Sequence, residues 1–177
     1  AKFVNLYSVQ ESVLAILVVG SIAHHFERPN SDIDVMLVVD EHEYETRQRD
    51  KKLAFSLWNI CTYEGGYIDC KVVNLAFLKL VSKQGSDAAR FAFEGAQIVF
   101  SRIAKLEAIL AEIVRFPSED QASRRHRFIS QVLAAKWYFS QGIEKNDAYL
   151  TCYAAQKVML FACRIVLNEN QMLFPYH

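Results

Sequence analysis

The sequence lacks an excess of charge of either sign, because its 20 Lys and Arg residues equal its 20 Asp and Glu residues. Proteins that coat a phosphate backbone usually carry a basic surplus, so this balance argues against a dedicated nucleic-acid-binding role. Hydrophobic residues make up 52% and charged residues 23% of the chain, which argues against disorder and coiled coil. The 177 residues also contain no internal repeat, and they predict one ordinary globular domain or two small ones.

Long hydrophobic runs and cysteine motifs are missing as well. The longest purely apolar run, Val13–Val19, has seven residues, whereas a membrane-spanning helix needs about 20. No signal-peptide pattern opens the chain, so we expect no export. The four cysteines form no C-x-x-C pair and have no histidine cluster at zinc spacing, so we expect them to be buried fillers. These absences predict a cytoplasmic protein with no membrane partner.

The pattern of apolar residues changes near residue 101. Before it, the runs Ala15–Val19, Asp32–Val39 and Tyr67–Val73 predict strands that alternate with helices. After it, a period of 3.6 residues predicts helices alone, in a three-helix bundle. The sequence therefore predicts an α+β fold, with a mixed β-sheet core and flanking helices over residues 1–101 and a C-terminal α-helical bundle over residues 102–177.

Local signals refine the expected helices. The pattern Ser8-x-x-Glu11 resembles a capping box and predicts a short helix over 8–14. Asn74 directly follows an apolar strand and is expected to cap the helix that starts after it. A long helix is expected after Glu41, because the charged stretch there leads into apolar residues at helical spacing: Leu53, Leu57, Trp58 and Cys61.

Gly20 and Ser21 end the first buried strand, just before a helical turn. Glycine has no Cβ, so backbone N–H groups of such a turn can approach an anion closely. The Ser21 hydroxyl can donate to a phosphate oxygen. Taken alone, Gly-Ser is also a common turn without any ligand.

Three aspartates stand in or beside the predicted strands. Asp32 and Asp34 precede an apolar run, and alternation puts them on the same face of the sheet. Paired carboxylates there call for a cation, and hard oxygen ligands favour Mg²⁺, although an exposed strand end with solvated charges is the alternative. Asp69 lies within another apolar strand, where aspartate is rare. Its alternatives are an ion pair with Lys71 or a solvent-facing position.

Gly20-Ser21, ten further residues and then Asp32-Ile33-Asp34 on a hydrophobic strand resemble the signature of the polymerase β-like nucleotidyltransferase superfamily. Asp69 occupies the place of that family's third carboxylate. The resemblance covers residues 8–73, and the helical tail resembles the C-terminal domain of antibiotic (aminoglycoside-type) nucleotidyltransferases. One departure stands out: many minimal members carry Ala-Arg-Gly shortly after the Gly-Ser, where this chain has Ala23-His24-His25. Either histidine is a candidate phosphate donor, with an ordinary surface position as the alternative.

The resemblance implies roles for each residue. Gly20 and Ser21 would hold the phosphates of ATP or another nucleoside triphosphate, and Ser31 is assigned to the same binding site. Asp32, Asp34 and Asp69 are assigned as catalytic and metal-binding residues for two Mg²⁺ ions. In this assignment Asp32 and Asp34 bind metal, and Asp69 completes the second metal site or acts as the general base.

The function implied is transfer of a nucleoside monophosphate, with ATP as the expected donor, to a hydroxyl of an acceptor, with release of pyrophosphate. The acceptor is an aminoglycoside-like small molecule or a protein side chain. The family also allows a homodimer in which a second subunit completes the pocket. The alternative is an antitoxin or regulatory protein of the same fold that acts through a partner chain. The three filled carboxylate positions favour the enzyme.

Overall fold

A computed structural model describes residues 1–175 of the chain. These residues divide into a first unit, Ala1–Arg115 with Pro175, and a second unit, Phe116–Phe174. The last two residues of the predicted 102–177 domain lie outside the described residues.

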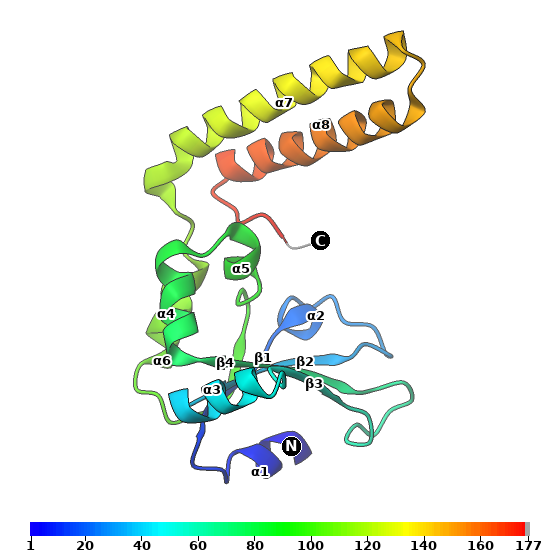
Figure 1. The fold of residues 1–177 in the computed structure, drawn as a ribbon. Coiled ribbons are helices and arrows are strands. Elements are labelled where there is room, and N and C mark those ends of the chain that lie inside the picture. The colour runs from blue at the N-terminus through cyan, green and yellow to red at the C-terminus, as the bar shows by residue number, and fades with distance from the viewer. Residues whose placement is uncertain (176–177) are drawn as a thin grey trace. The chain divides into compact units, whose positions relative to one another are not determined.

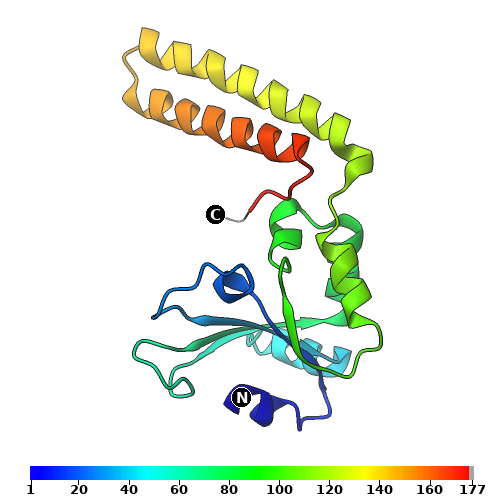
Figure 2. The ribbon, with the colours of Figure 1, turned by 180° about the vertical axis from the view of Figure 1, so that it is seen from behind.

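The first unit is a mixed sheet with helices (Figure 1; Figure 2 gives the opposite view). Its strands are β1 (Val13–Val18), β2 (Ile33–Val39), β3 (Ala54–Leu57), β4 (Ile68–Asn74) and β5 (Gln97–Ser101). Its helices are α1 (Lys2–Tyr7), α2 (Gly20–Ala23), α3 (Glu41–Arg49), α4 (Leu75–Gln84), α5 (Asp87–Phe91) and α6 (Leu106–Val114). The strand order is β3-β4-β2-β1-β5; β2 and β4 are parallel, and the other neighbouring pairs are antiparallel. This architecture confirms the predicted α+β class.

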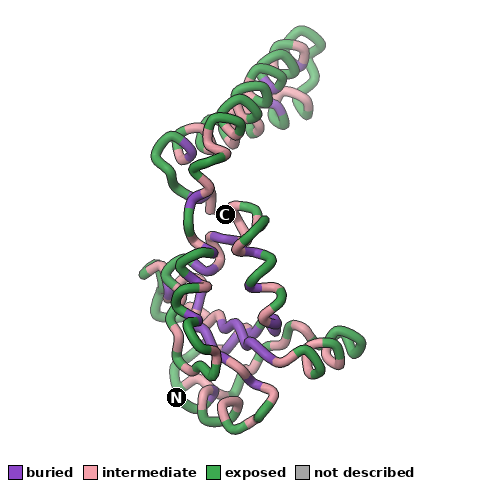
Figure 3. The backbone as a smooth tube through the Cα atoms, turned by 90° about the vertical axis from the view of Figure 1, so that its left-hand side faces the viewer, coloured by how far each residue is buried: buried purple, intermediate pink, exposed green. Residues whose placement is uncertain are grey.

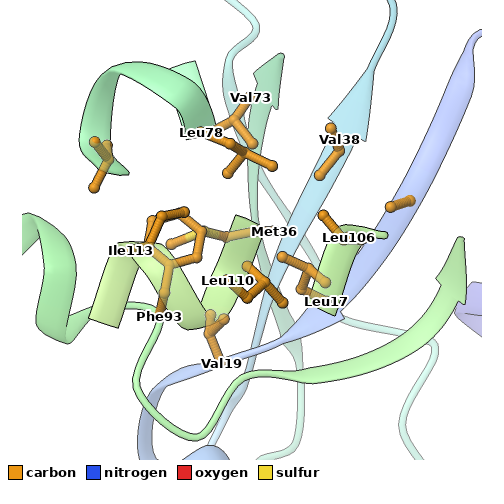
Figure 4. Close-up of a cluster of buried hydrophobic side chains, with 12 residues drawn as sticks. Leu17, Val19, Met36, Val38, Val73, Leu78, Phe93, Leu106, Leu110 and Ile113 are labelled. Atoms are coloured by element: carbon orange, nitrogen blue, oxygen red, sulfur yellow. The ribbon is translucent and has the colours of Figure 1, made fainter. Parts of the chain in front are cut away.

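Each face of the sheet is covered by its own apolar cluster. The cluster under α4 and α6 includes Leu17, Met36, Val38, Leu78 and Leu110 (Figure 4). The cluster under α1 and α3 includes Phe3, Ile16, Val35, Leu37 and Tyr44. Alternate residues of β1 and β2 therefore face opposite sides, as a strand requires. Burial of one such leucine or isoleucine side chain contributes about 1.5–3 kcal/mol.

The end of β4 is fixed by the start of the following helix. The Asn74 side chain accepts a hydrogen bond from the Phe77 backbone N–H at 2.8 Å, which confirms the predicted N-cap. Its side-chain amide also donates to both Glu41 carboxylate oxygens, at 2.9 and 3.0 Å. A cap of this kind contributes about 1 kcal/mol. Asn74 thus ties the first turn of α3 to the first turn of α4 and holds the carboxyl end of β4 between them.

One predicted helix is wrong, and the long helix expected after Glu41 forms only in its first part, as α3 (Glu41–Arg49). Helix α1 ends at Tyr7 with Ser8 as its C-cap, so the capping-box pattern there follows a helix instead of starting one. The apolar residues near Leu57 form strand β3, in which Phe55 pairs with Cys70 and Leu57 pairs with Ile68. Pairing with β4 half-buries Phe55 and Leu57 against the sheet, and this overrides a spacing that also suits a helix.

The first helix after residue 101, α6, packs in the first unit, although the sequence places it in the C-terminal bundle. Leu106 and Ile113 are fully buried in the cluster that α6 shares with α4. The unit boundary lies at Arg115 and Phe116, whereas the sequence pattern changes near residue 101. An amphipathic helix can bury its apolar stripe on a sheet as well as in a bundle, so periodicity alone does not locate this boundary.

The second unit is a helical hairpin. It contains the short 3₁₀ helix η1 (Ser118–Asp120), α7 (Gln121–Glu144) and α8 (Ala148–Glu169). Asp147 caps α8 by accepting from the Leu150 N–H at 2.9 Å. The buried Asn168 accepts from Arg124 Nε at 3.0 Å and donates to the Gln121 carbonyl at 3.1 Å, which joins the two helices at the open end of the hairpin. Most of this unit is exposed or half-buried (Figure 3).

Helix α8 is long and apolar enough to cross a membrane by length and composition, with a mean hydropathy of 1.4 over its best window, of which 6% is buried. A single helix of this kind indicates a membrane span only weakly. It carries Lys157 and Arg164, and each cation would cost about 2.5–3.5 kcal/mol at a bilayer centre. Arg164 instead lies 4.5 Å from the centre of the Phe174 ring within the hairpin.

Candidate functional site

Parallel pairing brings two of the predicted carboxylates together. Asp34 on β2 is directly opposite Asp69 on β4. Neighbouring strands lie about 4.8 Å apart, and paired residues of parallel strands point to the same face. Asp32 precedes β2 by one residue and stands two positions before Asp34. The fold therefore places all three carboxylates near the amino ends of β2 and β4, on the face covered by α4 and α6.

Asp34 is the electrostatic centre of this group. Burial raises the pKa of its carboxyl, and the nearby charge of Asp32 raises it further. Lys71 lowers the same pKa, and Asp69 raises it by the smallest contribution. A carboxylate whose pKa is raised by burial and by like charges is short of positive charge in its surroundings.

Asp69 has two polar neighbours from the same sheet. Its Oδ2 lies 3.9 Å from Lys71 Nζ, and its Oδ1 accepts from Ser56 Oγ at 3.4 Å. The ion pair between Asp69 and Lys71 that the sequence suggested is therefore present, and Asp69 also stands opposite Asp34 on the neighbouring strand. The Lys71 side chain is 60% exposed, and a pair so open to water holds its partner only loosely.

The turn after β1 packs against Asp34. Gly20 has a φ of +68°, and a Cβ added there would lie 2.0 Å from Asp34 Oδ2. The Val19 backbone N–H also donates to the Asp34 carbonyl at 3.0 Å. Only glycine satisfies both the left-handed backbone and the close approach. The Gly-Ser and the Asp-x-Asp that the sequence analysis combined are thus in direct contact.

The Ser21 hydroxyl is buried beside this turn. Among the described residues its Oγ has no hydrogen-bond partner. Leaving a buried polar atom unpaired costs about 1–3 kcal/mol, so such atoms in folded proteins call for a specific explanation. A ligand oxygen bound at the turn would supply the missing partner.

Ser31 differs from Ser21 in this respect. Its Oγ accepts from the Arg28 backbone N–H at 2.8 Å, and its carbonyl accepts from the Tyr63 hydroxyl at 2.7 Å. These bonds close the turn before Asp32 and fasten it to the loop between β3 and β4. Ser31 therefore shapes the approach to the carboxylates.

The two histidines that replace the family's Arg-Gly have distinct surroundings. The His24 ring stacks on Phe91 of α5, with centroids 4.5 Å apart. His25 is exposed and has a φ of +57°, a backbone conformation that glycine adopts more easily. His25 therefore adopts a left-handed backbone at a position where the family has glycine. His24 is packed on an aromatic ring.

Two aromatic residues near the carboxylates were missed by the sequence analysis. Trp58 and Tyr67 stack on each other across the β3–β4 loop, with ring centroids 4.2 Å apart. A hydrogen bond to the Asp32 carboxylate raises the pKa of the Tyr67 hydroxyl. The sequence signal for this pair depends on recognising β3 as a strand. Alternation then puts Trp58 on the same face as Ser56, and Tyr67 on the same face as Asp69.

The site offers carboxylate oxygens, which are the donors that Mg²⁺ prefers. Among the described residues, however, no three Asp, Glu, His or Cys side chains converge closely enough to form a ready-made metal centre. The donor set, the raised pKa of Asp34 and the unpaired Ser21 hydroxyl fit a cation bound together with an anionic ligand. That combination supplies the charge and the hydrogen-bond partner that these residues lack.

Comparisons with known proteins agree with this geometry. A family model described as a nucleotidyltransferase domain matches residues 3–99, more than half of the chain. The chain is also similar to the crystal structure of a nucleotidyltransferase-like protein from Exiguobacterium sibiricum 255-15, with a TM-score of 0.53 and 11% identity, a likeness that shows the fold. The match covers 94% of this chain and 55% of that one, so the chain spans about half that protein's length. Curated proteins give no significant match.

Proposed function

This chain belongs to the nucleotidyltransferase domain family, and we propose that it transfers a nucleoside monophosphate from a nucleoside triphosphate, ATP foremost, to a hydroxyl group. The acceptor oxygen attacks the α-phosphorus, the bond to the bridging oxygen of the β-phosphate breaks, and pyrophosphate leaves. The observation that carries this proposal is the contact between the Gly20 turn and Asp34, where a Cβ would lie 2.0 Å from the carboxylate. This contact places the glycine turn directly against one of the carboxylates.

The phosphates bind at the Gly20–Ser21 turn in this proposal. The backbone N–H groups of this turn would donate to phosphate oxygens, and so would the buried Ser21 hydroxyl, which has no hydrogen-bond partner among the described residues. This bond gives the unpaired Oγ its partner. Ser31 acts indirectly, because its hydroxyl already receives the Arg28 N–H.

Asp32, Asp34 and Asp69 are the residues that would hold Mg²⁺. When bound, the metal neutralises the triphosphate and stabilises charge that develops at the α-phosphate. The raised pKa of Asp34 supports this assignment, since a cation would relieve the repulsion that raises it. Asp69 completes the second metal site or acts as the general base, since its side chain is 31% exposed and accessible to an acceptor hydroxyl. Either role requires the same carboxylate in the same position.

The first test is a calorimetric titration of ATP, with and without Mg²⁺, into the wild type and the Asp32→Asn/Asp34→Asn variant. Binding that needs Mg²⁺ and disappears in the variant supports the site. Candidate hydroxyl acceptors, aminoglycoside-like compounds and proteins, are then screened for pyrophosphate release. A folded wild type that binds no triphosphate would contradict the proposal and favour a regulatory protein that acts through a partner.

A further inference from the structure

An exposed aromatic pair lies beside the carboxylates. The Trp58 and Tyr67 rings are 4.2 Å apart and inclined by 20°, a stacked arrangement. Trp58 directly follows β3 and Tyr67 directly precedes β4. The β3–β4 ladder ends at the pair Leu57–Ile68, and Trp58 and Tyr67 are the residues directly beyond that pair. Their stacking is the direct consequence of that register.

The pair is on the carboxylate face of the sheet. Side chains alternate along a strand, so Trp58 shares its face with Ser56, and Tyr67 shares its face with Asp69. Ser56 and Asp69 are themselves paired, and Asp69 pairs with Asp34. Tyr67 is two residues before Asp69, so the aromatic pair lies about 6.5–7 Å along the strand from Asp69.

Trp58 is held in place but not covered. Its side chain is backed by Tyr67, whose ring stacks on it. Even so, Trp58 is 64% exposed. Tryptophan is normally among the most extensively buried residues. An indole that is fixed on one side and open on the other is preorganised to receive a second flat ring, because little side-chain freedom remains to be lost.

We propose that Trp58 is the stacking platform for the nucleobase of the bound nucleoside triphosphate. This inference rests on the proposed function, which holds the phosphates at Gly20, Ser21 and the carboxylates. In a nucleotide one ribose separates the α-phosphate from the base. The aromatic pair lies two residues along the strand from Asp69, so a base can reach it while the phosphates are held near the carboxylates. Stacking on a ring favours any base, so Trp58 provides affinity and the platform accepts purines and pyrimidines alike.

The test compares Trp58→Ala with Trp137→Ala. Trp137 is the other tryptophan of the chain, is 58% exposed and belongs to α7 of the second unit, so it is a matched control. With Mg²⁺ present, Trp58→Ala is expected to weaken ATP binding on the order of 10-fold. Its affinity for inorganic triphosphate, which has no base, is expected to stay unchanged. Trp58→Phe keeps a ring and is expected to recover most of the ATP affinity.

A second measurement uses fluorescence. In a Trp137→Phe background Trp58 is the single tryptophan. Its emission is expected to be quenched by ATP and by CTP, and to be unaffected by inorganic triphosphate.

The outcomes separate this inference from the proposed function. If the wild type binds Mg²⁺–ATP and Trp58→Ala binds it equally well, the platform is refuted while the function stands. If Trp58→Ala loses ATP and triphosphate alike, the residue supports the fold of the site instead of the base, and the platform is again refuted. If the wild type binds neither ligand, both proposals fall together.

Discussion

The two halves of strand β2 have opposite properties. From Val35 to Val39 every side chain is buried, whereas Asp34 and the preceding Asp32 are half-buried and repel each other. The buried half contributes to the stability of both apolar clusters. The amino-terminal half is less stable, because it holds two carboxylates that repel each other. One strand therefore supplies the rigidity of the scaffold and the chemistry of the site, in segments that touch.

The sharpest way to test this division is to remove charge from the reactive half without changing its volume. Asp69→Asn is expected to reduce nucleotidyl transfer about 100- to 10,000-fold, the range for loss of a general base. Its melting temperature is expected to remain close to that of the wild type. The measurement is pyrophosphate release at saturating Mg²⁺–ATP.

Asp50→Asn is the matched control for Asp69→Asn. Asp50 also pairs with a lysine two positions later, Lys52, at 3.6 Å, but on the surface beyond α3. This variant is expected to retain wild-type activity. An equal loss in both variants would show that Asp69 has no special role.

The converse test disturbs the buried half. Leu37→Ala removes a fully buried side chain and is expected to destabilise the fold by about 2–5 kcal/mol. Leu80→Ala removes the same atoms from a side chain that is 50% exposed and is expected to change stability much less. Urea denaturation measures both. Similar midpoints for the two variants would contradict the assigned core.

The contact between the halves of the site is tested at Gly20. Gly20→Ala introduces a Cβ at a φ of +68° and 2.0 Å from Asp34 Oδ2, so it combines backbone strain with a clash. The expected loss of stability is about 1–3 kcal/mol, together with weaker triphosphate binding. Gly65→Ala has a φ of +75° with its nearest neighbour 4.0 Å away, so it reports the strain alone. Thermal unfolding of both should show the larger loss at Gly20.

The smallest expected effect is a gain. Because the pKa of folded Asp34 is raised, the folded protein holds this proton to a higher pH than the unfolded chain. Stability is therefore lost as the pH rises from the ordinary carboxyl range through the raised pKa. Asp34→Asn removes this loss and is expected to raise the melting temperature at pH 7, with a difference that shrinks toward pH 4. A lower melting temperature at pH 7 would show that the carboxylate stabilises the fold.

Several features of the site could be predicted from local sequence. Gly20 and the Asp32–Asp34 pair adjoin strongly apolar runs, and the contact between them follows once β1 and β2 are antiparallel neighbours. Asp69 was identified because aspartate is rare within a strand. These predictions succeeded in placing residues together because alternation and burial are properties of short segments.

Other features depend on contacts that no short segment contains. Leu53, Leu57, Trp58 and Cys61 have helical spacing, and only pairing with β4 turns part of this segment into a strand. Missing β3 also hid the stacked Trp58 and Tyr67. The difference between Ser21 and Ser31 is equally invisible in sequence, since both are serines beside turns. One hydroxyl is buried without a partner, and the other receives the Arg28 N–H.

The pairing of Asp34 with Asp69 also has a consequence during synthesis. The two residues are 35 positions apart in the chain, and β2 gains its neighbour β4 only when the later segment is made. At roughly 5–20 residues per second, a ribosome needs about 2–7 s to cover that interval. Meanwhile one edge of β2 is unpaired, which is a state prone to wrong association. The length of the segment between β2 and β4, which encodes helix α3 and strand β3, therefore sets how long this edge of the nascent chain stays unpaired.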